Sequence, residues 1–191
     1  MKSVTIFGAT GSVGQSAIDL IARAPDDYDV VALTGGRNIA QLAADARRLK
    51  AQVAVTCHAD LFHDLKELLA GSDVEVAAGD AAIADVAERG ADWTLSAIVG
   101  AAGLVPSLRA VAQGTTLALA NKESLVTAGP LLMQTAKAAG ATILPVDSEH
   151  SAVFQALVGE DIAAVERVII TASGGAFRDW PVADLAGASL A

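Results

Sequence analysis

Short apolar runs alternate with amphipathic stretches along most of the chain. The first apolar run, residues 4–7, leads into a glycine turn and then into a stretch whose apolar positions fit one face of a helix. Further apolar runs lie at 28–34, 53–56, 74–76, 93–98 and 115–120, separated by helical patterns at 38–50, 59–70, 81–88, 104–113 and 123–139. This alternation predicts an α/β fold, a Rossmann-like parallel sheet wrapped by helices on both faces.

Gly140 ends this pattern and marks a predicted domain boundary. Residues 1–140 are expected to form the Rossmann-like domain, and residues 141–191 the start of a second domain. In the second part, a strand is predicted at 141–146 and another at 165–170.

The composition limits the classes of protein that fit. Hydrophobic residues make up 53% of the 191 residues, which is ample for a buried core. A net charge of −9 argues against a nucleic-acid-binding protein, because phosphate backbones need a basic surface. The longest apolar stretch, Leu95–Leu108, contains glycine and proline and is too short to span a bilayer, so no membrane partner is expected. The lone Cys57 and the lack of room for a signal peptide before the first strand favour a cytoplasmic location.

Three glycines, Gly8, Gly11 and Gly14, lie between the first strand and the first helix. Their spacing differs by one position from the usual dinucleotide fingerprint. A strand, a glycine turn and a helix N-terminus bring backbone N–H groups and the positive end of a helix dipole close to a diphosphate. The turn therefore indicates a nucleotide-binding site, and the alternative is an ordinary tight connection.

The end of the second strand indicates which nucleotide is bound. Enzymes that use NAD usually carry Asp or Glu there for the ribose hydroxyls, whereas this chain has Gly36, Arg37 and Asn38. A guanidinium pairs well with a 2′-phosphate, so NADPH is the predicted cofactor. The alternative role for Arg37 is a solvated cap of the turn.

Two further strand ends carry residues that suit a site, because ligands of parallel sheets bind outside the C-terminal ends of the strands. The segment 98–103 contains two glycines that let the backbone approach either a cofactor or another helix, and both interpretations stay open. Asn121 fits a helix N-cap with Glu123 in the first turn, but Lys122 lies at the wrong end of the helix dipole. Its position suggests that Lys122 meets an anion or a polarised oxygen.

Acidic residues follow the predicted strand at 141–146. If the backbone stays extended, Asp147 and Glu149 point to the same side. Two carboxylates with the Ser148 hydroxyl between them suit Mg²⁺ or Mn²⁺. The alternative is that Asp147 or Ser148 caps a helix whose first turn prefers Glu149.

The last loop, residues 171–177, follows the predicted strand at 165–170. Its small hydroxyl residues, among them Ser173, and its glycine N–H groups suit a phosphate. A plain turn fits the same residues.

Five motifs resemble, in their order, those of the 1-deoxy-D-xylulose 5-phosphate reductoisomerase family of isoprenoid biosynthesis. They are Gly8–Gly14 (GATGSVG), Ala97–Leu104 (AIVGAAGL), Leu119–Thr127 (LANKESLVT), Leu144–His150 (LPVDSEH) and Ala172–Gly175 (ASGG). Because they extend over nearly the whole chain, the set is more specific than any single motif. The departures are small: Val13, Ser151 and Ala176 stand where the family commonly has Ile, Asn and Pro.

The resemblance implies a set of ligand-binding residues. Besides Gly8 of the glycine turn, the implied NADPH contacts are Thr10, Gly11, Ser12, Val13, Gly36, Arg37, Asn38, Asn121 and Glu123. The implied substrate contacts are Lys122, Ser148, Glu149 and Ser173, and the implied metal ligands are Asp147 and Glu149.

The resemblance also implies a reaction. A homodimeric enzyme with NADPH and a divalent metal would convert 1-deoxy-D-xylulose 5-phosphate, a small sugar phosphate, to 2-C-methyl-D-erythritol 4-phosphate. Lys122, Asp147 and Glu149 would lie at the catalytic centre, and residues 141–191 would begin an α+β catalytic domain. Family members continue well beyond this length, so the chain is expected to represent the N-terminal half of the enzyme. The alternative is a non-catalytic NADP-binding module.

Overall fold

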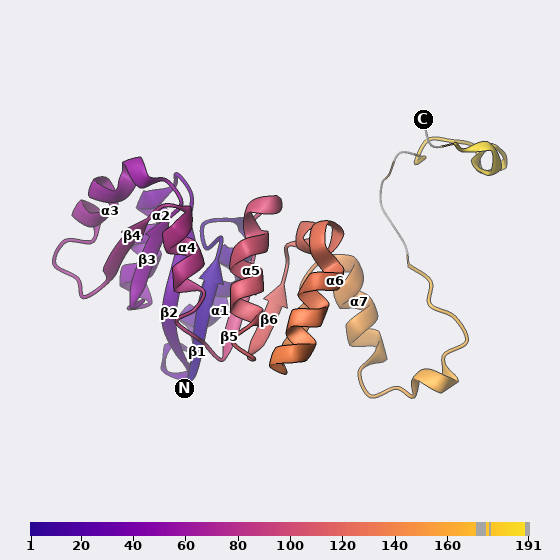
Figure 1. Cartoon of the computed structure of the whole chain (residues 1–191), viewed down its shortest axis with the longest axis horizontal. Coiled ribbons are helices and arrows are strands. Elements are labelled where there is room, and N and C mark those ends of the chain that lie inside the picture. The colour runs from indigo at the N-terminus through magenta and orange to yellow at the C-terminus, as the bar shows by residue number, and fades with distance from the viewer. Residues whose placement is uncertain (171–174, 176, 190–191) are drawn as a thin grey trace. The chain divides into compact units, whose positions relative to one another are not determined.

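The computed structural model describes residues 1–170, 175 and 177–189. In this part of the chain, seven parallel strands form one sheet in the order β4-β3-β2-β1-β5-β6-β7 (Figure 1). The strands are β1 (Lys2–Phe7), β2 (Tyr28–Gly35), β3 (Val53–Thr56), β4 (Glu75–Ala78), β5 (Trp93–Ser96), β6 (Thr116–Leu119) and β7 (Thr142–Pro145). The predicted parallel sheet is confirmed, and each strand expected before residue 147 is present.

Helices connect successive strands. They are α1 (Ser12–Arg23), α2 (Ile39–Arg48), α3 (Phe62–Leu68), α4 (Asp80–Val86), α5 (Leu104–Val111) and α6 (Lys122–Ala139), with short 3₁₀ helices at Pro25–Asp27, Ala59–Leu61 and Ala101–Gly103. The Asn38 side chain caps α2 by accepting from the Gln41 N–H, as its sequence position predicts. Gly140 ends α6 in a left-handed conformation that suits glycine, with φ of 72°.

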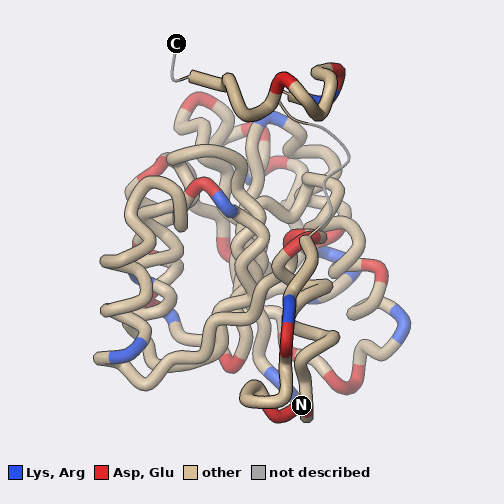
Figure 2. Tube along the Cα trace, turned by 90° about the vertical axis from the view of Figure 1, so that its right-hand side faces the viewer, with Lys and Arg blue, Asp and Glu red and all other residues tan. Residues whose placement is uncertain are grey.

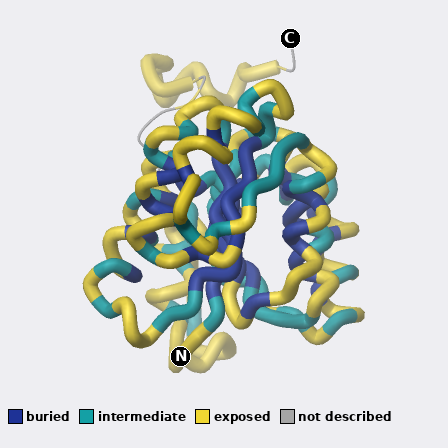
Figure 3. The backbone as a smooth tube through the Cα atoms, turned by 90° about the vertical axis from the view of Figure 1, so that its left-hand side faces the viewer, coloured by how far each residue is buried: buried dark blue, intermediate teal, exposed yellow. Residues whose placement is uncertain are grey.

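The helices cover both faces of the sheet. Successive residues of a strand point to opposite faces, so neighbouring residues belong to different core clusters. Ile6 belongs to a core cluster that includes Ile18 of α1 and Leu42 of α2. Phe7, the next residue, belongs to a second cluster that includes Leu132 of α6. These five side chains are fully buried. Figure 3 shows this buried interior in dark blue, and it confirms the expected coverage on both faces.

The last strand belongs to the first compact unit. β7 pairs with β6 from Thr116↔Thr142 to Leu119↔Pro145, so its backbone hydrogen bonds are made within the Rossmann-like sheet. The chain divides into the units Met1–Asp147 and Ser148–Ala191. The predicted boundary after residue 140 therefore lies one strand before the structural division.

The second unit contains regular helices but no strand in its described residues. It includes α7 (Ser148–Leu157) and 3₁₀ helices at Ile162–Ala164 and Val182–Gly187. The backbone does not stay extended through Glu149, because α7 begins at Ser148, so the condition for Asp147 and Glu149 to point to the same side is not met. The predicted strand at 165–170 is also wrong, since a strand needs a partner for its backbone groups and no described strand pairs with it.

Charged groups of the first unit form local pairs at the surface. Arg89 contacts Glu75 at 2.7 Å, and Arg109 contacts Asp85 and Glu88 at 3.1 and 3.0 Å. Figure 2 shows basic and acidic residues scattered along a trace that is mostly uncharged. A nearby carboxylate therefore balances the charge of each of these two arginines. None of the described helices combines the length and apolar character needed to cross a bilayer.

Candidate cofactor-binding site

The main candidate site lies at β1, where the order of strands in the sheet reverses. β1 pairs with β2 on one side and with β5 on the other. In Rossmann-type sheets, ligands bind at such a switch point, in the crevice outside the carboxyl ends of the strands. A pocket of about 590 Å³ lies there. Its walls come from the ends of several strands, and representative lining residues are Gly8, Gly36, Cys57, Asp80 and Ile98. This size and position suit a nucleotide.

The glycine turn is closely packed. Gly8 has φ of 79°, and a Cβ there would lie 2.6 Å from the Ala97 carbonyl oxygen. A Cβ at Gly14 would lie 2.3 Å from the Gly8 carbonyl oxygen. Both positions therefore exclude any side chain. A Cβ at Gly11 would lie 3.4 Å from its nearest neighbour, the Gly8 carbonyl oxygen. The turn is more than a loose connection, because two of its three glycines are required by close backbone approach.

The same turn presents the start of α1. Gly11 is the N-cap, and Ser12 and Val13 occupy the first helical turn, whose N–H groups have no carbonyl partner within a helix. Gly8 and Gly11 both line the pocket. The Gly8 N–H is already held by the Thr34 hydroxyl at 3.1 Å, which fixes the turn against β2. Donors at the start of α1 together with the helix dipole suit a diphosphate.

The loop after β2 carries the exposed guanidinium. The Arg37 side chain is 70% exposed, and it lies 3.7 Å from the Asp60 carboxylate. Gly36 lines the pocket immediately before it. A loose, exposed ion pair contributes little, so the guanidinium remains accessible to a phosphate. The cap of the next helix is Asn38, as described above, rather than Arg37.

Asn121 is engaged within the protein. Its amide nitrogen donates to the carbonyl oxygens of Ile98 and of Gly100, the latter at 2.9 Å. Its amide oxygen accepts from the N–H and the hydroxyl of Ser124, both at 2.7 Å. The residue is 2% exposed. Its side chain therefore fastens the loop after β5 to the start of α6.

The loop after β5 contributes both to the pocket lining and to internal packing, while the approach of its glycines to a cofactor stays a prediction. Ile98 and Ala101 line the pocket, whereas Gly103 packs so closely on Asn121 that a Cβ would lie 2.5 Å from the amide nitrogen. The Ser107 hydroxyl also donates to the Gly103 carbonyl oxygen at 2.6 Å. The loop therefore lines the pocket along much of its length, while Gly103 packs within the protein.

Lys122 and Glu123 follow this clamp as the first two residues of α6. Lys122 is exposed and Glu123 is half-buried. The ammonium group is therefore accessible at a helix N-terminus on the strand-end side of the sheet. This placement fits an anionic ligand better than it fits stabilisation of the helix itself.

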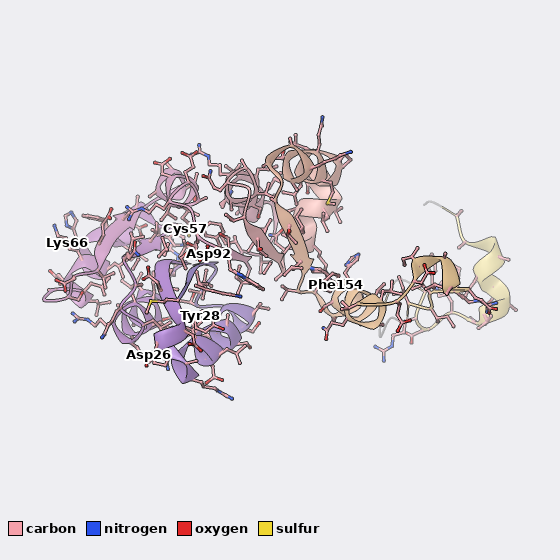
Figure 4. The ribbon with its side chains drawn as sticks, turned by 90° about the horizontal axis from the view of Figure 1, so that it is seen from below. Asp26, Tyr28, Cys57, Lys66, Asp92 and Phe154 are labelled. Carbon is pink, nitrogen blue, oxygen red and sulfur yellow. The ribbon has the colours of Figure 1, made fainter. Side chains whose placement is uncertain are left out.

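Two pocket residues were missed by sequence reasoning. Cys57 follows β3 and lies beside the pocket, and Figure 4 labels it. Burial raises the pKa of its thiol, the Asp80 carboxylate raises it further, and Arg37 opposes the shift. Asp80, the first residue of α4, lines the pocket as well. Both residues follow strand ends, so the rule that indicated Arg37 applies equally to them.

The acidic residues expected to hold a metal lie on either side of the division between the units. Asp147 is the last residue of the first unit and is half-buried, whereas Ser148 and Glu149 are exposed residues of α7. The Ser148 hydroxyl donates to the Glu149 carboxylate at 3.1 Å. Within the described residues, no group of three or more His, Cys, Asp or Glu side chains is gathered as for a metal. Ser173 lies outside the described residues.

Comparison with known proteins adds a decisive observation. The sequence profile of 1-deoxy-D-xylulose 5-phosphate reductoisomerase matches residues 4–129, about two thirds of the chain. The chain belongs to this reductoisomerase family. The profile of the C-terminal domain of 1-deoxy-D-xylulose 5-phosphate reductoisomerase matches residues 143–191, a range that begins within β7.

Curated relatives agree with the profiles. The 1-deoxy-D-xylulose 5-phosphate reductoisomerase of Jannaschia sp. (strain CCS1) is 72% identical over 190 residues, which cover 100% of this chain and 48% of the relative. The enzyme of the same name from Ruegeria pomeroyi is 68% identical, covering 99% of this chain and 48% of the relative. The chain thus spans about half the length of the curated reductoisomerases that it matches.

Solved reductoisomerase structures have the same fold. The structure from Zymomonas mobilis in complex with NADPH is 51% identical, has a TM-score of 0.89, and is matched over 98% of this chain and 50% of that one. A DOX-P reductoisomerase in complex with NADPH, fosmidomycin and magnesium is 37% identical with a TM-score of 0.84, over 99% of this chain and 49% of that one. At these identities, the likeness extends beyond the fold to the sequence.

Proposed function

We propose that this chain supplies the NADPH-binding part, and some of the catalytic residues, of an enzyme that converts 1-deoxy-D-xylulose 5-phosphate to 2-C-methyl-D-erythritol 4-phosphate. The observation that carries the proposal is the pocket at the end of β1, which is lined by the closely packed glycine turn and by Gly36, the residue before the accessible Arg37. Two similar reductoisomerases whose structures were solved in complex with NADPH support it. We also infer, from the family resemblance, that the whole protein acts as a homodimer.

The cofactor fits the residues present. Gly8 and Gly14 let the turn pack closely on the surrounding backbone, which fixes the start of α1, and the N–H groups there suit a diphosphate. Arg37 would pair with the 2′-phosphate, and Asn38, Gly36 and Thr10 would complete that side of the site. NADPH supplies the hydride that reduces the rearranged substrate.

The metal-ligand proposal rests on the chemistry of the donors. Asp147 and Glu149 offer carboxylate oxygens, which suit Mg²⁺ or Mn²⁺, and a similar DOX-P reductoisomerase was solved in complex with magnesium. A divalent ion there supplies Lewis-acid polarisation of the hydroxyl and carbonyl oxygens of the sugar. Two carboxylates make an incomplete ligand set, so further oxygen donors are expected in the whole protein.

The remaining residues would orient the substrate and stabilise its charge. The exposed Lys122 ammonium would stand beside the oxygen that gains negative charge. The hydroxyls of Ser148 and Ser173 would hold the sugar phosphate, so that binding energy away from the reacting carbon positions it. Asn121 would act through its clamp on the loop after β5, and Glu123 from the first turn of α6.

Titration of the 191-residue chain with NADPH and NADH tests the cofactor proposal. Arg37→Ala is expected to weaken NADPH binding by about 10- to 100-fold and to leave NADH binding within about twofold, because only NADPH carries the 2′-phosphate. Arg23→Ala is the matched control, since Arg23 pairs with Asp19 at the other end of α1. Equal binding of both nucleotides by the unaltered chain would contradict the proposal.

Turnover is tested with the natural gene product that contains this chain. Substrate-dependent loss of nicotinamide absorbance is expected with 1-deoxy-D-xylulose 5-phosphate, NADPH and Mn²⁺, and Lys122→Gln should lower kcat by about 100-fold or more. The second candidate function is the alternative named above, a non-catalytic NADP-binding module. NADPH binding without any turnover in that gene product would support the module.

A further inference from the structure

A buried carboxylate joins the two helices that begin at the proposed phosphate-binding loops. Asp45 of α2 is 2% exposed. Its Oδ2 accepts from the side-chain amide of Gln15 at 2.7 Å and from that of Gln41 at 2.9 Å, and its Oδ1 accepts from Arg48 at 3.1 Å. Gln15 lies on α1, whereas Gln41 and Arg48 lie on α2. The carboxylate therefore links α2 to α1 in addition to its contacts within α2.

The link continues into the glycine turn. The Gln15 amide nitrogen also donates to the Ala9 carbonyl oxygen at 2.9 Å. The Ala9 N–H in turn donates to the Thr34 carbonyl oxygen on β2 at 2.7 Å. A continuous set of hydrogen bonds thus runs from the Asp45 carboxylate through Gln15 to the turn between Gly8 and Gly14.

The two ends of this link are the two ends of the proposed cofactor site. α1 begins directly after the turn proposed for the diphosphate, and α2 begins two residues after Arg37, proposed for the 2′-phosphate. Gly8 and Gly36, one from each loop, line the same pocket. Both phosphates belong to one covalent molecule, so the site must hold its two loops at a fixed spacing to bind both at once.

Packing by itself does not require a carboxylate at this position. Asp45 lies on the buried stripe of α2 with Leu42 and Ala46, which are both fully buried. Removing a carboxylate from water is costly unless partners compensate, and an apolar side chain would avoid that cost. What the carboxylate adds is directional hydrogen bonding between two helices.

We propose that Asp45 is a positioning residue that sets the spacing between the diphosphate-binding turn and the 2′-phosphate-binding loop. The proposal rests on the proposed NADPH function of these loops. It gives Asp45 no contact with the cofactor, and its effect is confined to ligands that occupy both loops together. Ligands that reach only one loop gain nothing from the spacing.

Three probes separate positioning from general support of the fold. ADP carries the diphosphate but no 2′-phosphate, 2′-AMP carries the 2′-phosphate but no diphosphate, and NADPH carries both. The quantity measured by titration of the 191-residue chain is the NADPH association constant divided by the product of the ADP and 2′-AMP association constants. This ratio reports how well the two loops are spaced.

Asp45→Asn is expected to lower the ratio by about fivefold or more, since an amide cannot accept from Gln15, Gln41 and Arg48 together. Gln15→Met keeps Asp45 paired with Gln41 and Arg48 but removes the link to α1, and it should lower the ratio similarly. It also serves if Asp45→Asn does not fold. Asp19→Asn, which removes an exposed acid from α1, should leave the ratio unchanged.

Each outcome decides the proposal. Equal weakening of all three ligands, with the ratio unchanged, would overturn it in favour of a purely structural role. No change in any affinity would overturn it too. If the unaltered chain bound neither NADPH nor the two fragments, the proposed function itself would fail, which is a different result from an unchanged ratio in a chain that binds them.

Discussion

The two compact units differ in how they enclose their apolar side chains. In Met1–Asp147, large residues such as Phe7 and Leu132 are fully buried between the helices and strands of the sheet. In the second unit, none of the described residues is buried, and Phe154, Ile169 and Trp180 are 44%, 75% and 46% exposed. Burial of apolar area is the main stabilising contribution to a fold. The first unit therefore provides a packed core for the proposed cofactor site, whereas the described residues of the second unit bury little apolar area.

This contrast separates the proposed cofactor residues from Ser148, Glu149 and Ser173. The cofactor residues lie on elements whose positions follow from a core that the chain itself provides. Ser148 and Glu149 lie at the start of α7, in the unit whose described residues bury no side chain. The curated relatives are about twice as long as this chain, and they are the proteins in which the roles of these residues can be compared.

The largest expected effect comes from truncating the same side chain in each unit. Phe7→Ala should lower the free energy of unfolding by about 3–5 kcal/mol, because it removes a fully buried ring and leaves a cavity. Phe154→Ala, on α7 (Figure 4), should lower it by less than about 1 kcal/mol. Urea unfolding followed by circular dichroism measures both. Similar losses at the two positions would break the contrast between the units.

A smaller effect is expected from adding one methyl group to a glycine. Gly8→Ala forces a Cβ within 2.6 Å of a backbone oxygen at φ of 79°, so it should cost about 1–3 kcal/mol and weaken NADPH binding. Gly187→Ala, in the second unit, meets no atom within 4 Å and should change stability by less than about 0.5 kcal/mol. Thermal unfolding and NADPH titration of both variants provide the test. A well-tolerated Gly8→Ala would argue against close packing of the turn.

The reactivity of Cys57 tests whether the nucleotide binds in the pocket of the first unit, because Cys57 lines that pocket. Because burial and Asp80 raise the pKa of the thiol, alkylation by iodoacetamide at a pH of about 8 should be slower than for a free cysteine. Saturating NADPH should slow it by a further factor of about ten, since Cys57 lines the proposed site. Mass spectrometry of the labelled chain follows the rate. An alkylation rate that is the same with and without NADPH would show that the nucleotide binds elsewhere.

The smallest effect concerns pH and the connection between β1 and β5. The N–H and hydroxyl of Ser3 donate to the Asp92 carboxylate at 2.8 and 3.0 Å, and these bonds lower the pKa of Asp92. A folded pKa below the unfolded one contributes stability at pH above the ordinary carboxyl range, and that stability is lost as pH falls through the folded value. Asp92→Asn should therefore be less stable than the unaltered chain at a pH of about 7, and the difference should shrink towards a pH of about 3. Asp184→Asn in the second unit serves as the control, with no difference expected at either pH.

Most of the fold of the first unit was predictable, because its signals are local. Alternating apolar runs and helical stripes indicated each strand before residue 147, and Gly140 ended α6 as expected. The second unit was less predictable for the opposite reason. Residues 165–170 have the apolar content of a strand, but content alone provides no partner for backbone hydrogen bonds.

The site was predicted in its chemistry but not in its connections. Arg37 and the glycine turn were found from strand ends, and the same rule applied to residues 57 and 80 would have added two more. Asp45 also carried a signal, since its position falls on the apolar stripe with Leu42 and Ala46. Its partner Gln15 is 30 residues away, and no local pattern pairs them.

The amino-acid sequence by itself determined the order of elements, the glycine turn and the side chains at the strand ends, because each depends on residues close together in the chain. Only the tertiary structure decided that β7 joins the first sheet, that the Asn121 amide is used internally, and that Asp45 links α2 to the glycine turn. Those facts depend on which distant segments become neighbours. That choice is made by burial and hydrogen bonding summed over the whole unit rather than by any local pattern.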